Sequence, residues 1–252
     1  MPATFNKNDA TLYRTAGAAM TAITLFALVA LLHHPTGGRV HSAQESLAQM
    51  AAMQSSAATV HGVLIAMFAI MATAHAALAA LLGAARPPVR LGMTAYGLAC
   101  CLFTVAMLCD GFVAPQLARQ FVDSTAVQAT QAHAVLVALG TVIQVFTKAG
   151  LLALGVAFPA FAYALVSAPA PLPWARLLAL VGLLAGLLPA AYMVFGEVQL
   201  NPSNLPMLFG VQAVWNLGAA CMLVLGSARR AQQGGQIDGR VAGVYKPVDA
   251  QS

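Results

Sequence analysis

The sequence has few charged side chains. Charged residues make up 8% of its 252 positions, whereas hydrophobic residues make up 60%. A soluble domain carries roughly 25% charged residues and about 45–50% apolar ones. Because most of the surface of a compact domain faces solvent, a chain this apolar has too few polar groups to cover itself in water. The composition therefore predicts an integral membrane protein in contact with the lipid bilayer.

Several motifs that would define a chemistry are also missing. The sequence contains no GxxxxGK[ST] phosphate loop, no HExxH and no GxSxG. The four cysteines have no CxxC spacing, so neither a disulfide framework nor a zinc site is predicted. The formal net charge is +5, but the basic residues form no basic face with interleaved aromatics, which argues against nucleic-acid binding. The sequence favours a non-enzymatic protein without settling the question.

Six apolar segments are long enough to cross a bilayer, for which a helix needs about 20 residues. The predicted spans cover residues 13–32, 60–82, 91–114, 135–166, 174–195 and 205–227. The fourth is long, and we expect one helix with a kink near Pro159. Helical patterns start before the second and fourth spans, near Gln44 and Thr125, so both helices are expected to project beyond the membrane. The predicted fold is an all-α six-transmembrane-helix bundle over residues 1–230, followed by a disordered tail at 231–252.

The distribution of basic residues predicts the orientation. Short cytoplasmic loops carry an excess of Lys and Arg. With the N-terminus inside, the inner segments hold nine such residues and the outer segments hold two, Arg39 and Arg119. We therefore predict an N-in, C-in protein of the cell membrane, either plasma or inner. The apolar run of the first span is longer than a signal-peptide core, so we expect that span to be retained.

Ionisable groups inside a bilayer are costly and often mark a functional site. The candidates are Asp110, Lys148, His75 and Glu197. In the predicted orientation, all but the deeper His75 lie toward the outer face. The sharpest predicted contact joins Asp110 to Lys148, because opposite charges at similar depth relieve each other. Such a pair either fixes the helix register or takes part in a proton or ion relay, and the sequence leaves both open.

The histidines of the second and fourth spans suggest a haem site. His61 and His75 are 14 residues apart, which places them about 40° apart around a helix. This spacing is similar to that of the di-haem membrane cytochromes b. The resemblance is incomplete, because the position 14 residues after His133 is Thr147. At most one haem b, between His61 and His133, is compatible with the sequence, and two interfacial histidines without a ligand are the alternative.

The first outer loop offers a weaker metal site. It contains three imidazoles, which suit copper or zinc, at His33, His34 and His41. No acid or thiol lies among them, so a hydrated loop without a metal is the alternative.

Two features of the last spans are expected to support helix packing. Gln212 and Asn216 are predicted to form hydrogen bonds between helices. The sequence from Gly182 to Gly186 fits a GxxxG face on which another helix packs closely.

Three functional hypotheses follow from this pattern. The first is a small transporter, permease component or sensor with a polar site toward the outer face. The second is a b-type haem redox protein that uses His61 and His133. The third is a structural or assembly subunit of a membrane complex. Homo-oligomers and partner membrane subunits both remain open.

Overall fold

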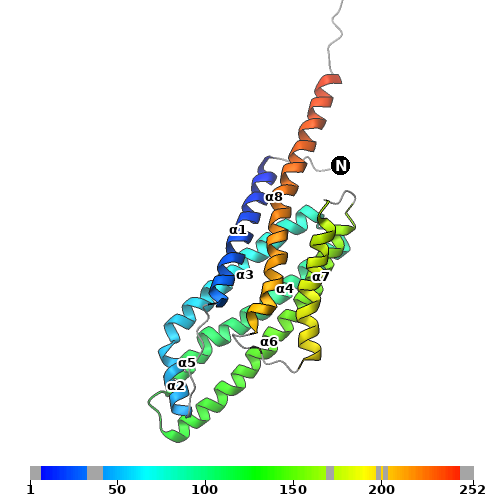
Figure 1. Ribbon diagram of the computed structural model, residues 1–252. Helices are drawn as coiled ribbons and strands as arrows, with labels where there is room; N and C mark the ends of the chain where they lie inside the picture. Colours follow the sequence, from blue (N-terminus) through cyan, green and yellow to red (C-terminus); the bar gives the residue numbers. More distant parts are fainter. Residues whose placement is uncertain (1–6, 33–41, 169–172, 197–199, 201–203, 245–252) are drawn as a thin grey trace, which may run out of the picture.

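The computed structural model describes residues 7–32, 42–168, 173–196, 200 and 204–244 (Figure 1). This part of the chain forms eight α-helices and one π-helical segment, and it contains no strand. The elements are α1 Lys7–Leu32, α2 Ala43–Ala52, α3 Gln54–Leu82, α4 Pro87–Leu108, η1 Cys109–Val113, α5 Ala114–Phe121, α6 Ala126–Val166, α7 Ala175–Phe195 and α8 Leu205–Val244. The all-helical prediction is confirmed for the described residues.

Six of the helical stretches are long and apolar enough to cross a membrane. Each of them overlaps one of the six predicted spans, and the third continues through η1 into α5. Large apolar side chains face outward along them, and on α7 these include Leu177, Leu180 and Leu187, each more than half exposed. Such a surface fits lipid and not water. These helices indicate a multi-pass membrane protein.

The bundle is held by α4 against α6, α6 against α7, and α1 against α8, while α3 packs between α1 and α4 (Figure 1). Its core contains several fully buried aromatic rings, among them Phe158, Phe161 and Trp215. The predicted GxxxG face packs as expected. A Cβ added at Gly182 would lie 2.6 Å from the Trp215 ring, and one at Gly186 would lie 2.6 Å from the Pro159 ring. Only glycine permits helices to approach this closely.

The predicted single long helix in the fourth segment is confirmed. α6 has 41 residues and runs on through Pro159. At 1.5 Å per residue it is about 60 Å long, about twice the thickness of a hydrocarbon core. Its N-terminus is fixed by a capping box in which Thr125 and Gln128 bond to each other's backbone N–H. The first turns of α6 extend past the nearer ends of α7 and α8, and α2 and α5 pack beside them (Figure 1).

A second, smaller core lies at this extended end, where α2 and α5 pack against the first turns of α6 (Figure 1). We call it the distal cluster; its buried residues are Leu47, Ala114, Ala118, Ala129, Ala132 and Leu136. Helix formation does begin near Gln44, as predicted, but the helix is interrupted at Met53, which separates α2 from α3. At the other end, α8 runs to Val244 and so includes part of the segment for which the sequence predicts disorder. Residues 245–252 of that segment lie outside the described residues.

Candidate functional site

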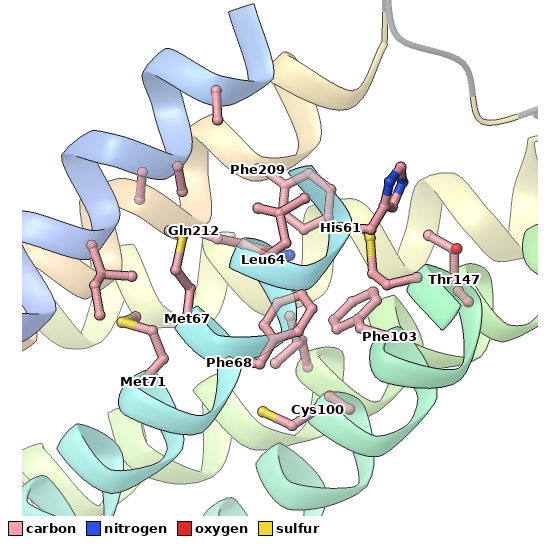
Figure 2. A pocket seen from close by; sticks show the side chains of 18 of the residues that line it. His61, Leu64, Met67, Phe68, Met71, Cys100, Phe103, Thr147, Phe209 and Gln212 are labelled. Carbon is pink, nitrogen blue, oxygen red and sulfur yellow. The ribbon is translucent and has the colours of Figure 1, made fainter. Parts of the chain in front are cut away.

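A cavity of about 440 Å³ lies inside the bundle, within the usual range of about 300–1,000 Å³ for small-molecule sites. Its wall is built from α1, α3, α4, η1, α6 and α8, together with Leu200 (Figure 2). Most of the wall is aliphatic, aromatic or sulfur-containing, and Figure 2 shows this part around Leu64, Met67, Phe68, Met71, Cys100, Phe103 and Phe209. The cavity is therefore suited to an apolar molecule.

Only a few polar side chains line the cavity, and most of them are already paired. The Thr24 hydroxyl donates to the Met20 carbonyl at 2.7 Å, and the Thr147 hydroxyl donates to the Ile143 carbonyl at 2.8 Å. Gln144 holds the backbone of Leu200 with two hydrogen bonds, one accepted and one donated. These side chains already form hydrogen bonds within the protein and do not require a ligand to satisfy them.

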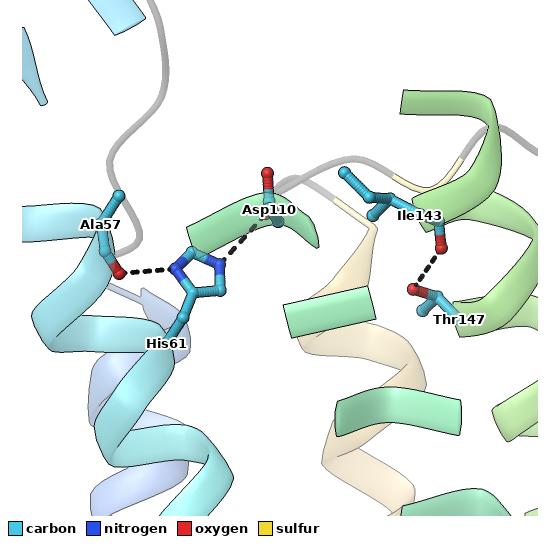
Figure 3. A network of polar contacts seen from close by, with 5 residues as sticks. All are labelled: Ala57, His61, Asp110, Ile143 and Thr147. Carbon is cyan, nitrogen blue, oxygen red and sulfur yellow. Dashed lines mark hydrogen bonds and ion pairs between the residues drawn. The ribbon is translucent and has the colours of Figure 1, made fainter. Parts of the chain in front are cut away.

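His61 and Asp110 form an ion pair at one edge of this cavity (Figure 3). The Nε2 atom of His61 lies 3.1 Å from Oδ2 of Asp110, and its Nδ1 atom lies 2.8 Å from the Ala57 carbonyl oxygen. The His61 side chain is 6% exposed, whereas that of Asp110 is 47% exposed. The pair thus reaches from the interior of the bundle to its surface.

The π-helical segment η1 brings Asp110 to this position. Its wider turn ends with a hydrogen bond from the Ala114 N–H to the carbonyl of Cys109, five residues earlier. Pro115 follows, and its ring supplies no N–H for the carbonyl of Gly111, which disfavours an ordinary α-turn here. Gly111 packs against the His61 side chain so closely that a Cβ would collide with it. Single π-turns of this kind are frequent at functional sites.

The hydrogen bonds of His61 with Ala57 and Asp110 determine how many protons the pair holds. The Ala57 carbonyl can only accept, so Nδ1 must donate to it. A neutral imidazole then has no proton on Nε2, and two acceptors would face each other if Asp110 were ionised. The hydrogen bond to Asp110 therefore needs one more proton, on Nε2 or on the carboxyl group. His61 and Asp110 therefore share one proton between Nε2 and the carboxyl group, and with this proton bound the pair has a net charge of zero.

A second, smaller cavity of about 150 Å³ adjoins the first. Its wall includes residues of α2, α3, η1 and α5, among them Met50 and Pro115, together with Met53. Both cavities have Val60, His61 and Asp110 in their walls. The ion pair is consequently part of the walls of both cavities.

The predicted contact between Asp110 and Lys148 does not form in the structure, where Asp110 pairs with His61 instead. η1 packs mainly against α3 and much less against α6, so the carboxylate faces α3. Lys148 is half-buried on α6 beside Thr147 but is not part of the cavity wall. The prediction used only the similar depth of Asp110 and Lys148 along their helices. It contained no information about the direction in which each side chain points around its helix axis.

His75 lies in the core of the bundle and outside the cavity wall. It is 0% exposed and stacks on Tyr96, with ring centroids 3.9 Å apart. Its Nδ1–H donates to the Met71 carbonyl, and its Nε2 atom has no partner among the described residues. Phe158 and Phe161 lie against the same ring. This aromatic setting gives His75 a packing role.

The geometry around His61 bears on the haem hypothesis. A haem iron bound at Nε2 would have to replace the contact with Asp110. His133 is half-buried on the projecting part of α6, next to Ala132 of the distal cluster. Ligation of one haem by both histidines would thus require the ion pair to break.

The remaining predicted site residues, Glu197, His33, His34 and His41, lie outside the described residues. Within the described part of the chain, no three His, Cys, Asp or Glu side chains are grouped so that they could hold a metal ion.

Gln212 and Asn216 differ from the prediction made for them. Both line the cavity, and neither Nε2 of Gln212 nor Oδ1 of Asn216 has a hydrogen-bond partner among the described residues. The expected interhelical bonds are therefore not made by these atoms. Their spacing of four residues on an apolar helix was the only sequence signal that they share one face.

No family model matches this chain, and no curated protein or solved structure matches it either.

Proposed function

We propose that this chain is a small transporter of the cell membrane that binds a mainly apolar molecule inside its helical bundle. The cavity of about 440 Å³ is the observation that carries the proposal, because it is enclosed by five of the six candidate spans. Substrate sites of membrane transporters commonly lie within the bundle, between helices. The molecule would occupy the space between α3, α4, α6 and α8.

The His61–Asp110 contact favours transport over binding of the molecule without transport. It lies in the wall of the large cavity and in that of the smaller one, and it depends on one proton. Loss of that proton would leave two acceptors facing each other and would favour opening of the contact. The pair would then act as a gate, and its proton would couple opening to pH. In the proposed N-in, C-in orientation this gate lies toward the outer face.

Binding of small apolar molecules to the purified protein tests the first part of the proposal. Equilibrium dialysis against identical detergent on both sides measures the molecule held by protein beyond that held by micelles. Ala213 is 6% exposed on the cavity wall, so Ala213→Phe should fill the cavity and abolish binding. Ala27→Phe fills the cavity from α1 and provides a second test in case Ala213→Phe does not fold. Ala66→Phe on the exposed face of α3 is the matched control.

Binding that is lost in both cavity variants and kept in Ala66→Phe supports the proposal. Equal binding to all four proteins would show that the molecule sits outside the cavity and would contradict it. The bound molecule is then offered to proteoliposomes. Uptake that is absent in Ala213→Phe supports transport, whereas binding without uptake would contradict the transporter function.

A further inference from the structure

Two carboxamide side chains on one face of α8 enter the cavity. Gln212 and Asn216 are four residues apart, so they lie one above the other on the helix. Both belong to the cavity wall, and Figure 2 shows Gln212 near Leu64 and Met67. Gln212 is 5% exposed. This places a polar strip on an otherwise apolar surface.

The strip presents one unpaired donor and one unpaired acceptor. The Nε2 group of Gln212 and the Oδ1 atom of Asn216 lack a hydrogen-bond partner among the described residues. The other uncharged polar side chains of the wall, such as Thr147 and Gln144, do have partners. A buried polar group without a partner destabilises a fold by about 1–3 kcal/mol. These two amides therefore have hydrogen-bonding capacity that a molecule bound in the cavity, or water held there, would satisfy.

The charges of the wall limit what that molecule is. No Lys, Arg or Glu lines the cavity, and its one carboxylate, Asp110, already faces His61. An anion would find no compensating cation there, and a buried unpaired charge is strongly unfavourable. A neutral molecule avoids this penalty.

Resting on the proposed function, we infer that the transported molecule is uncharged, mainly apolar and carries one hydroxyl or carboxamide group. Such a group both accepts and donates, so it satisfies Gln212 and Asn216 together. An ether or ketone would satisfy only the donor. The apolar remainder of the molecule fills the space toward Met67, Phe68 and Phe103.

A pair of probes of equal shape tests this class. 4-Phenylbutan-1-ol carries a terminal hydroxyl where pentylbenzene carries a methyl group. Their binding is measured by equilibrium dialysis to the wild type, Gln212→Leu and Asn216→Leu, with Ala213→Phe as the blank. Each Leu substitution should weaken the alcohol by about tenfold, the equivalent of one hydrogen bond, and leave pentylbenzene unchanged or slightly tighter.

The outcomes separate the two proposals. If neither probe binds the wild type above the blank, cavity binding fails and this inference fails with it. If both probes bind but the Leu variants change them equally or not at all, only the ligand class is overturned. The melting temperature without ligand gives an independent check of the unpaired amides. Gln212→Leu should keep or raise it, and a clear fall would show that the amide is already bonded within the protein.

Discussion

The Nε2 atom of His61 lies 3.1 Å from Oδ2 of Asp110, although the two residues are 49 positions apart in the chain. His61 is buried in α3, and Asp110 is half-exposed on the π-helical segment that follows α4. The contact lies at one edge of the internal cavity and needs one proton to hold both hydrogen bonds of the imidazole. The first three predictions concern this pair and the cavity that it borders.

Removal of the Asp110 carboxyl group should destabilise the protein, because His61 loses its hydrogen bond to that group. Asp110→Leu removes the hydrogen bond between Asp110 and the buried Nε2 atom of His61, a loss of about 1–3 kcal/mol. Asp110→Asn should cost less, because the side-chain amide can donate to Nε2 of a neutral His61. Thermal unfolding in detergent should therefore rank the wild type first, then Asn, then Leu. Equal melting temperatures for Asn and Leu would mean that the hydrogen bond contributes nothing.

A methyl group at Gly111 should displace His61. The added Cβ of Gly111→Ala would collide with the His61 side chain, and forced overpacking costs about 1–3 kcal/mol. Gly140→Ala on α6 is the matched control, since its Cβ would meet nothing within 4 Å. The control should be neutral or stabilise by about 0.5–1 kcal/mol through the better helix propensity of alanine. Loss of stability in Gly140→Ala, or none in Gly111→Ala, would contradict this packing.

Breaking the pair should open the cavity to water. Cys100 lines the cavity and serves as its natural reporter once Cys101, Cys109 and Cys221 are replaced by Ala. A cationic, membrane-impermeant methanethiosulfonate should modify Cys100 in proteoliposomes several times faster in Asp110→Ala than in the parent. Asp123→Ala removes an exposed carboxylate elsewhere and should leave the rate unchanged. An unchanged rate in Asp110→Ala would show that the pair is not the gate.

The sequence predicted the membrane class and the helices more fully than the site. Spans and helix ends depend on local composition, and the capping box at Thr125 and Gln128 is a local signal. Asp110 and His61 were both expected near the same end of neighbouring spans, but depth says nothing about rotation around a helix axis. That rotation follows from the π-turn at Cys109–Val113, which the spacing of apolar residues in the sequence does not predict. In a bilayer, lipid and protein interior are both apolar, so the cavity wall also left no pattern.

The proposed orientation rests on the excess of Lys and Arg in the inner segments and can be tested by itself. A green fluorescent protein fused after Ser252 should fluoresce, and alkaline phosphatase at the same place should be inactive. Alkaline phosphatase inserted after Asp123, in the turn between α5 and α6, should be active. The reverse pattern would invert the topology and move the gate to the cytoplasmic side.

Protection of Cys100 by a ligand tests the central claim, that a mainly apolar molecule binds inside the bundle, most directly. The single-cysteine protein is treated with uncharged methyl methanethiosulfonate, with and without saturating 4-phenylbutan-1-ol. The account predicts that the alcohol slows modification of Cys100 and leaves the rate at Cys221, kept alone in a second protein on the exposed face of α8, unchanged. An equal rate at Cys100 with and without the alcohol would contradict binding in the cavity.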